Sequence, residues 1–284
     1  MEKDGLGVRE IPPDVYWGIQ TFRAVENFPI TGAEISSYPL LVTALAQIKR
    51  AALLANFDLG LIERSKKDAI EQACLEIEQG RLREQFVVDP IQGGAGAPTN
   101  TNANEVIANR ALERLGHERG SYSVIHPSSD VNMSLSTEDV YPTAVRIASI
   151  QGAQELLSAI GHLRAELARK AIELTDISKM GRTGCKAATP MTLGQEFEGY
   201  AVMLDEDQRR IREALSHLHK ISLGATAPGT AIDRHPRYAS KFWVYLREIT
   251  LSRSRERDAC RGASGQPRVR TPLGCAQAQR RHAL

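Results

Sequence analysis

The chain has 284 residues, of which 42% are hydrophobic and 25% charged, with a formal net charge of +2. This length can bury a substantial core in one or two domains, and the composition is that of an ordinary soluble protein. No apolar run approaches the length of a bilayer span, the start MEKDGLG is not a signal peptide, and four widely spaced cysteines without a C-x-x-C pair indicate free thiols in a reducing cytoplasm. Plentiful Ala and Leu with few aromatic residues favour a mainly α-helical fold.

Residues 1–35 are predicted to form an extended, loop-rich arm, because prolines and glycines interrupt any helical pattern there. Arg23 and Glu26 lie in this arm and could contact a subunit or a substrate. A surface ion pair between the two is the expectation that we favour.

Apolar residues at helical spacing predict one helix over 39–59 and a second over about 65–79. The sequence Asp58-Leu59-Gly60 is expected to close them into a helical hairpin. The string FVVDPIQGG that follows predicts a short extended segment.

Two polar segments, each rich in glycine or hydroxyl groups, come next, and each leads into a helical pattern. The first holds Gly93, Gly94 and Gly96, several candidate caps (Thr99, Asn100, Thr101, Asn102), and then the apolar helix positions Ala108, Ala111, Leu112 and Leu115. The second places Ser134, Ser136, Thr137 and Asp139 ahead of Pro142, which is tolerated in the first turn of a helix. Hydroxyls and backbone N–H groups that converge on a helix start form a site for anionic groups such as carboxylates.

Dense apolar positions predict a long buried helix from Thr143 to about Thr175. A loop in which Gly181 and Gly184 flank Thr183 should follow, and Pro190 and Thr192 are expected to open another helix that runs to about His219. A last helix is predicted from about Pro236 to Thr250.

The character of the sequence changes after Leu251. From residue 253 on, eight arginines face only Glu256 and Asp258, so this end carries a net charge of +6 and the rest of the chain −4. We interpret residues 251–284 as a disordered or out-of-frame tail rather than a nucleic-acid-binding arm, because no aromatic residues lie between the arginines for base stacking.

Several strings between residue 5 and about residue 250 resemble the aspartase/fumarase superfamily, and within it the aspartate ammonia-lyases: DVYWGIQTFRAVENFPITG, NANEVIANRALE, DVYPTAVRIA, MTLGQEF and SLGATAPGTAI. The resemblance implies a mixed N-terminal lyase domain (1–140), a partial central long-helix bundle (141–250) and the non-family tail (251–284). It also implies a cytoplasmic homotetramer whose active sites each take segments from three subunits. No metal, organic cofactor or membrane is implied.

The implied reaction is the reversible deamination of L-aspartate to fumarate and ammonia. A loop serine removes a proton beside the β-carboxylate, and preorganised donors stabilise the dianionic carboxylate that forms. By the resemblance, Ser136 and Thr137 bind that carboxylate and Thr183 helps to hold the substrate. Asn100 and Asn104 are expected to hold their loop, and His126 is either a secondary anion contact or a helix cap.

Four positions depart from the family pattern. Ala97 replaces a substrate-binding threonine, Glu138 replaces an amide that contacts the amino group, Gly184 replaces a histidine, and Asp233 replaces an asparagine. Glu138 would attract an ammonium group but repel a substrate with two carboxylates.

The family's G-S-S-x-M-P-x-K-x-N signature, which carries the catalytic serine and a lysine for the α-carboxylate, is absent from these 284 residues. No catalytic residue is therefore named, and the chain is expected to be a C-terminally truncated lyase of impaired activity. Two alternatives stay open. One is a non-catalytic helical subunit that assembles with an intact lyase, and the other is a fumarase, which hydrates fumarate to L-malate.

Overall fold

The structure, a computed structural model, describes residues 1–221 and 235–259, with side chains up to Thr250. The whole string SLGATAPGTAI (222–232) and Asp233 lie outside the described residues, as does the tail after Ala259. The chain divides into two compact units, which are described separately. The first comprises Met1–Ala148 and the described residues after Lys220, and the second comprises Ser149–Lys220.

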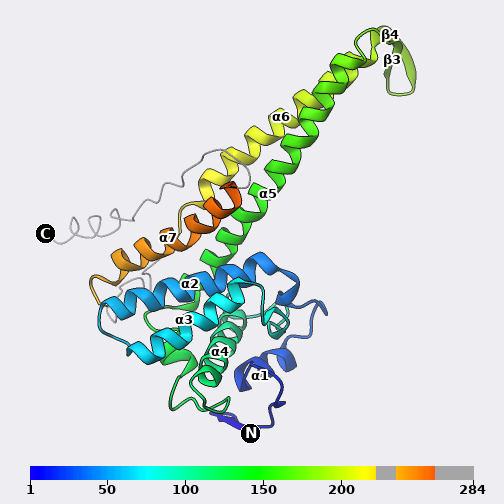
Figure 1. Ribbon diagram of the computed structural model, residues 1–284. Helices are drawn as coiled ribbons and strands as arrows, with labels where there is room; N and C mark the ends of the chain where they lie inside the picture. The colour runs from blue at the N-terminus through cyan, green and yellow to red at the C-terminus, as the bar shows by residue number, and fades with distance from the viewer. Residues whose placement is uncertain (222–234, 260–284) are drawn as a thin grey trace, which may run out of the picture. The chain divides into compact units, whose positions relative to one another are not determined.

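The first unit is mainly helical, as the sequence predicted (Figure 1). Its helices are α1 (Ile19–Asn27), α2 (Pro39–Asp58), α3 (Arg64–Glu78), α4 (Ala97–Arg114), the start of α5 (Thr137–Glu173) and α7 (Tyr238–Ala259), with short turns at Ile35–Ser37, Arg83–Gln85 and Pro127–Val131. An antiparallel hairpin of β1 (Glu2–Asp4) and β2 (Gly7–Arg9) precedes them. The predicted hairpin of α2 and α3 is confirmed within one residue at each end.

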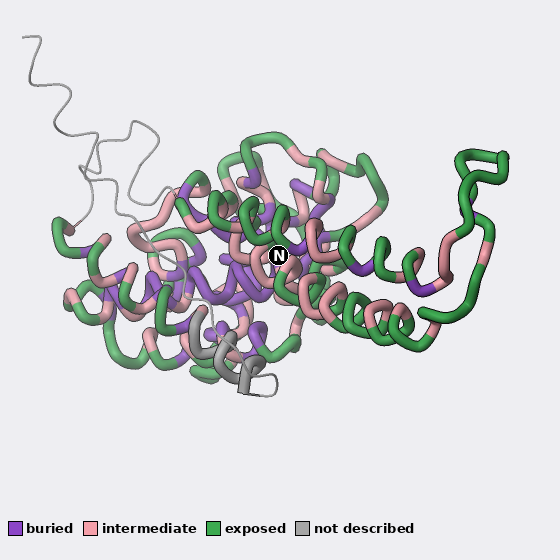
Figure 2. Tube along the Cα trace, turned by 90° about the horizontal axis from the view of Figure 1, so that it is seen from above, coloured by how far each residue is buried: buried purple, intermediate pink, exposed green. Residues whose placement is uncertain are grey.

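Helix α2 is the centre of the core and packs against α3, α4 and α7. Contrary to the sequence-based expectation, it is long and apolar enough to cross a membrane by length and composition, but 78% of that window is buried in the protein. Most buried residues of this unit lie on these helices, and Figure 2 shows buried segments gathered in the interior of the unit. Burial of this extent indicates a core helix.

The N-terminal arm is more ordered than predicted, because α1 forms inside it. The Glu105 carboxylate on α4 accepts hydrogen bonds from the backbone N–H groups of Gly18, Gln20 and Thr21 at 2.8–3.0 Å. The first N–H groups of a helix have no partner within it, so a buried carboxylate at that point stabilises its start. The expected pair between Arg23 and Glu26 is wrong: Arg23 pairs with Asp4 at 2.6 Å, and Glu26 lies 3.9 Å from Arg9.

Three further boundaries differ from the prediction. Helix α4 begins at Ala97, so the candidate caps Thr99–Asn102 lie inside the helix, and the capping residue is Gly96 at φ +88°. Helix α5 begins at Thr137 rather than at Thr143, and α7 continues to Ala259 rather than ending at Thr250. The string FVVDPIQGG, predicted as a short extended segment, is not part of a strand, and its Phe86 and Val88 carbonyls accept hydrogen bonds from the N–H groups of Ser36 and Ile35.

The second unit is a helical hairpin made by the rest of α5 and by α6 (Leu193–Leu218). The segment between them, predicted as a loop, is an antiparallel β-hairpin of β3 (Ser178–Thr183) and β4 (Lys186–Thr192), visible at the tip of the hairpin in Figure 1. Thr192 caps α6, and with Gln195 it forms a reciprocal capping box, whereas Pro190 lies in β4. Most of this unit is exposed or half-buried in Figure 2.

Candidate functional site

The start of α5 is held by a reciprocal pair of hydrogen bonds. The Ser136 hydroxyl donates to the Asp139 carboxylate at 2.8 Å and accepts from the Asp139 backbone N–H at 3.2 Å, while the Ser136 N–H donates to the same carboxylate at 3.0 Å. This is the geometry of a capping box with Asp in place of Glu. Because a serine hydroxyl has one proton, Ser136 has none left for a bound anion in this arrangement.

The Thr137 hydroxyl acts as a hydrogen-bond acceptor, whereas the Ser136 hydroxyl donates its proton to Asp139. Its hydroxyl oxygen accepts from the side-chain amide of Asn100 at 3.4 Å, and within the described residues no hydrogen bond from its proton is present. Thr137 is also the first residue of α5, where the backbone N–H groups lack helical partners and the helix dipole favours negative charge. The Thr137 hydroxyl is therefore the available donor at this helix start.

The two polar segments meet at this point. Gly96 needs its positive φ, and a Cβ on it would lie 2.2 Å from Cγ of Tyr141. The Tyr141 ring in α5 therefore packs on the backbone at the start of α4. Ala97 begins α4 and is half-buried.

Behind this helix start lies a fully buried lysine, Lys49 of α2. Its ammonium donates to Oδ1 of Asn100 at 2.6 Å and to Oδ1 of Asn132. Burial lowers the pKa of Lys49 from 10.5 to about 7, against an opposing influence of Cys74 and Asp139. Asn132 in turn donates to the backbone carbonyl of Leu135 at 3.0 Å.

The loop before α5 has a second anchor on α2. Asn56 donates to the carbonyl of Met133 at 3.0 Å and accepts from the Ser134 hydroxyl at 2.9 Å. Ser134 has φ +61°, a left-handed conformation that a serine adopts only when its surroundings impose it. Residues 132–137 are thus held by two side chains from the C-terminal half of one buried helix.

The remaining predicted site residues lie apart from this cluster or face solvent. Glu138 is exposed in the first turn of α5. The Nδ1 atom of His126 accepts from the N–H groups of Ser128 and Ser129 at 3.1 and 3.2 Å, which makes it the cap of the Pro127–Val131 turn. Thr183 is exposed at the end of β3 in the second unit, where Gly184 takes up the turn at φ +59°.

Sequence reasoning named Ser136, Thr137 and Asn100, which the structure brings together at the start of α5, but it did not name Lys49 or Asn132. Lys49 follows Ile48, an apolar position of the predicted helix. Helical spacing alone therefore allowed the Lys49 side chain to point into solvent. The only signal for its burial is that α2 is apolar on nearly every side, which the helical spacing alone did not reveal.

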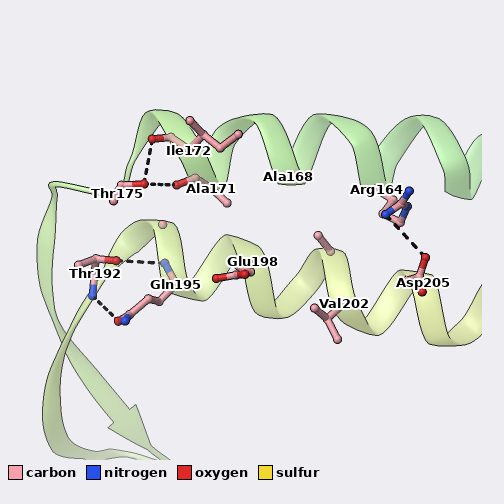
Figure 3. Close-up of a pocket in the computed structure, with 12 residues that line it drawn as sticks. Arg164, Ala168, Ala171, Ile172, Thr175, Thr192, Gln195, Glu198, Val202 and Asp205 are labelled. Carbon is pink, nitrogen blue, oxygen red and sulfur yellow. Dashed lines mark hydrogen bonds and ion pairs between the residues drawn. The ribbon is translucent and has the colours of Figure 1, made fainter.

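The second unit holds a groove of about 570 Å³ between α5 and α6 (Figure 3). Small and apolar side chains such as Ala168, Ile172 and Val202 line it, with an ion pair between Arg164 and Asp205 at 3.6 Å. None of the predicted substrate residues lines this groove. Large apolar side chains are exposed elsewhere on the same unit: Leu156, Leu163, Ile177, Tyr200 and Met203.

Comparison with known proteins agrees with the resemblance. A model of the lyase family matches residues 7–264. An aspartate ammonia-lyase of Pseudomonas aeruginosa is 51% identical over 239 residues, which are 84% of this chain and 50% of that protein. A cobalt-bound fumarate lyase:delta crystallin from Brucella melitensis is 49% identical with a TM-score of 0.85, covering 88% of this chain and 54% of that one. A class II fumarase from Schistosoma mansoni is 31% identical with a TM-score of 0.82, covering 94% and 55%.

We predict that the buried lysine makes stability depend on pH. Between pH 7 and 10.5 the unfolded chain binds a proton at Lys49 that the folded chain has released, so the free energy of unfolding rises with pH in that window. The rise is at most about 5 kcal/mol, and below pH 7 the folded protein carries the full cost of the buried charge. Urea unfolding from about pH 6 to pH 10 should show this slope in the wild type but not in a Lys49→Met variant. Parallel slopes for the two proteins would contradict the assignment.

Proposed function

The chain belongs to the lyase family whose model it matches, and on that premise we propose that it is an aspartate ammonia-lyase-type protein. The reaction of this type is the reversible elimination of ammonia from L-aspartate to give fumarate. The identity favours this over a fumarase, because it is 51% with an aspartate ammonia-lyase and 31% with a class II fumarase. The chain spans about half the length of the curated relatives it matches, so the activity, substrate and partners of a whole lyase are proposals for it.

One observation carries the proposal: the Thr137 hydroxyl, at the first turn of α5, keeps a proton for an anion. We propose that this hydroxyl and the neighbouring N–H groups bind the β-carboxylate of the substrate, which gains charge when the adjacent carbon, Cβ, loses its proton. Fixed donors of this kind lower the barrier because they need no reorganisation as the charge develops. Ser136 serves by holding the turn through Asp139.

Two of the other predicted positions fit a modified site. Glu138 stands one residue from Thr137 and is exposed, so it would attract the substrate ammonium while repelling a second carboxylate. Ala97 offers no hydroxyl, so the start of α4 contributes only backbone there. Thr183 lies on the second unit, and we propose that it reaches a substrate bound mainly by another copy of the chain, as the family's shared sites imply.

The partners that we propose are a small dicarboxylate or amino-acid substrate and further lyase chains, as a homo-oligomer, a tetramer in the family, in the cytoplasm. The groove between α5 and α6, with exposed Leu156, Leu163 and Met203 on the same unit, supports association through 143–219. A non-catalytic subunit in a mixed oligomer with an intact lyase is the second candidate. It is favoured by Ala97, Glu138 and Gly184, which stand where the family pattern has a threonine, an amide and a histidine.

The two hydroxyls at the start of α5 should respond differently to substitution. Thr137→Val should weaken fumarate binding about tenfold or more, with Thr137→Ser as the control that keeps the donor. Ser136→Ala should cost about 1 kcal/mol of stability through the lost cap and leave the affinity for fumarate within about threefold. Titration calorimetry and urea unfolding measure the two effects, and the reverse pattern would refute our division of roles.

We expect the purified chain alone to release no measurable ammonia from L-aspartate, because it lacks the serine loop that provides the base. The formation of fumarate, followed by its ultraviolet absorbance, is the assay. Co-expression with a tagged full-length aspartate ammonia-lyase tests the second candidate, since a mixed subunit should co-purify with the tagged protein. Rapid formation of fumarate from L-aspartate by the chain alone would contradict this expectation.

Exposed apolar helix faces on the second unit should make the chain self-associate. Sedimentation at high protein concentration should show oligomers, and replacing Leu163 and Met203 together with Glu should shift the chain toward monomer. Arg209→Glu and Arg210→Glu on the charged part of α6 form the matched control. A wild-type chain that stays monomeric throughout would count against this interface.

A further inference from the structure

Lys49 is an unusual residue to bury, because its ammonium loses its water and gains no bonded carboxylate among the described residues. Its two hydrogen-bond acceptors are neutral amide oxygens, Oδ1 of Asn100 and Oδ1 of Asn132. An apolar side chain of similar length would avoid the cost of desolvation. A role in stability therefore does not account for this lysine.

The bonds of Lys49 fix the orientation of the Asn100 amide. A side-chain amide has one acceptor end and one donor end, and the two ends are assigned by their hydrogen-bond partners. A charged lysine has three N–H donors and no acceptor, so while Lys49 is protonated the Asn100 oxygen must face it and the Asn100 NH₂ group must face away. That NH₂ group donates to Oδ1 of Asn132 at 3.3 Å and to the Thr137 hydroxyl oxygen at 3.4 Å.

The direction of the Asn100 amide then decides the direction of the Thr137 proton. A hydroxyl that accepts from an NH₂ group must turn its own proton elsewhere, where a bound anion can use it. If the amide were flipped, its oxygen would face Thr137 and take that proton. The site would then lose its donor without any change in the backbone.

We propose that Lys49 is a positioning residue that holds the Asn100 amide in the orientation that keeps the Thr137 proton available to a carboxylate. The same ammonium ties Asn132, and with it the loop that enters α5, to the centre of the core. The inference rests on the proposed function for the identity of the anion, but the orientation of the amide stands on the hydrogen bonds alone.

The decisive variant is Asn100→Asp, which has nearly the same shape. A carboxylate in that place keeps the bond with Lys49 and strengthens it, but it has no N–H to donate to Thr137. We expect the variant to stay folded and to bind fumarate at least about tenfold more weakly, because the Thr137 proton turns to the new carboxylate. Unchanged affinity in a folded Asn100→Asp chain would overturn the proposal.

Lys49→Met supplies the complementary measurement. It should be at least as stable as the wild type near neutral pH, since no charge is buried, yet it should bind fumarate about tenfold more weakly and exchange the amides of residues 132–139 faster. Ile70→Ala, a truncation in the core on α3, is the control that lowers stability while leaving the affinity unchanged. A Lys49→Met chain that loses stability but keeps both its affinity and its exchange pattern would show a structural role only.

The two proposals fail in different ways. If the wild-type chain does not bind fumarate, the proposed carboxylate site fails. Amide exchange over residues 132–139 then decides for Lys49: faster exchange in Lys49→Met than in a control of equal stability supports its positioning role, and equal exchange overturns it.

Discussion

Burial of α2 on nearly all sides is the constraint on which the first unit depends. A helix packed by α3, α4 and α7 at once cannot leave a lysine to water, so the hydrogen bonds of Lys49 must come from the protein. The acceptors that meet this need, Asn100 and Asn132, lie on α4 and on the loop before α5. One buried lysine thus joins α4 to the loop that enters α5.

Two side chains of helix α4 form hydrogen bonds with the first residues of two other helices. Glu105 on α4 accepts the free N–H groups at the start of α1, and Asn100, five residues earlier, reaches the start of α5. Both contacts use a side chain from another element where a local cap is missing or already engaged. The polar string NTNANE therefore acts mainly as the interior of a helix that organises its neighbours, although its composition is typical of caps.

The sequence predicted what depends on local patterns and missed what depends on distant partners. The α2 and α3 hairpin, the long α5 and the α6 helix follow from apolar spacing, and Ser136 and Thr137 follow from the resemblance together with their place before Pro142. Helix α1 was missed because its start is satisfied by Glu105, and the burial of Lys49 was missed because α7, which includes residues more than 180 positions from α2 along the chain, helps to cover that helix. The split between Ser136 and Thr137 needed hydrogen-bond directions, which no residue pattern contains.

Thr137 and Thr183 belong to different units of the chain. Thr137 begins α5 in the first unit, and Thr183 ends β3 in the second unit, where its side chain is exposed. The second unit also exposes large apolar side chains, among them Leu156, Leu163 and Met203. Exposed apolar surface of this kind marks a place where proteins associate. We therefore propose that the second unit is where copies of the chain meet, and that Thr183 acts, in such an assembly, on a substrate held by another copy.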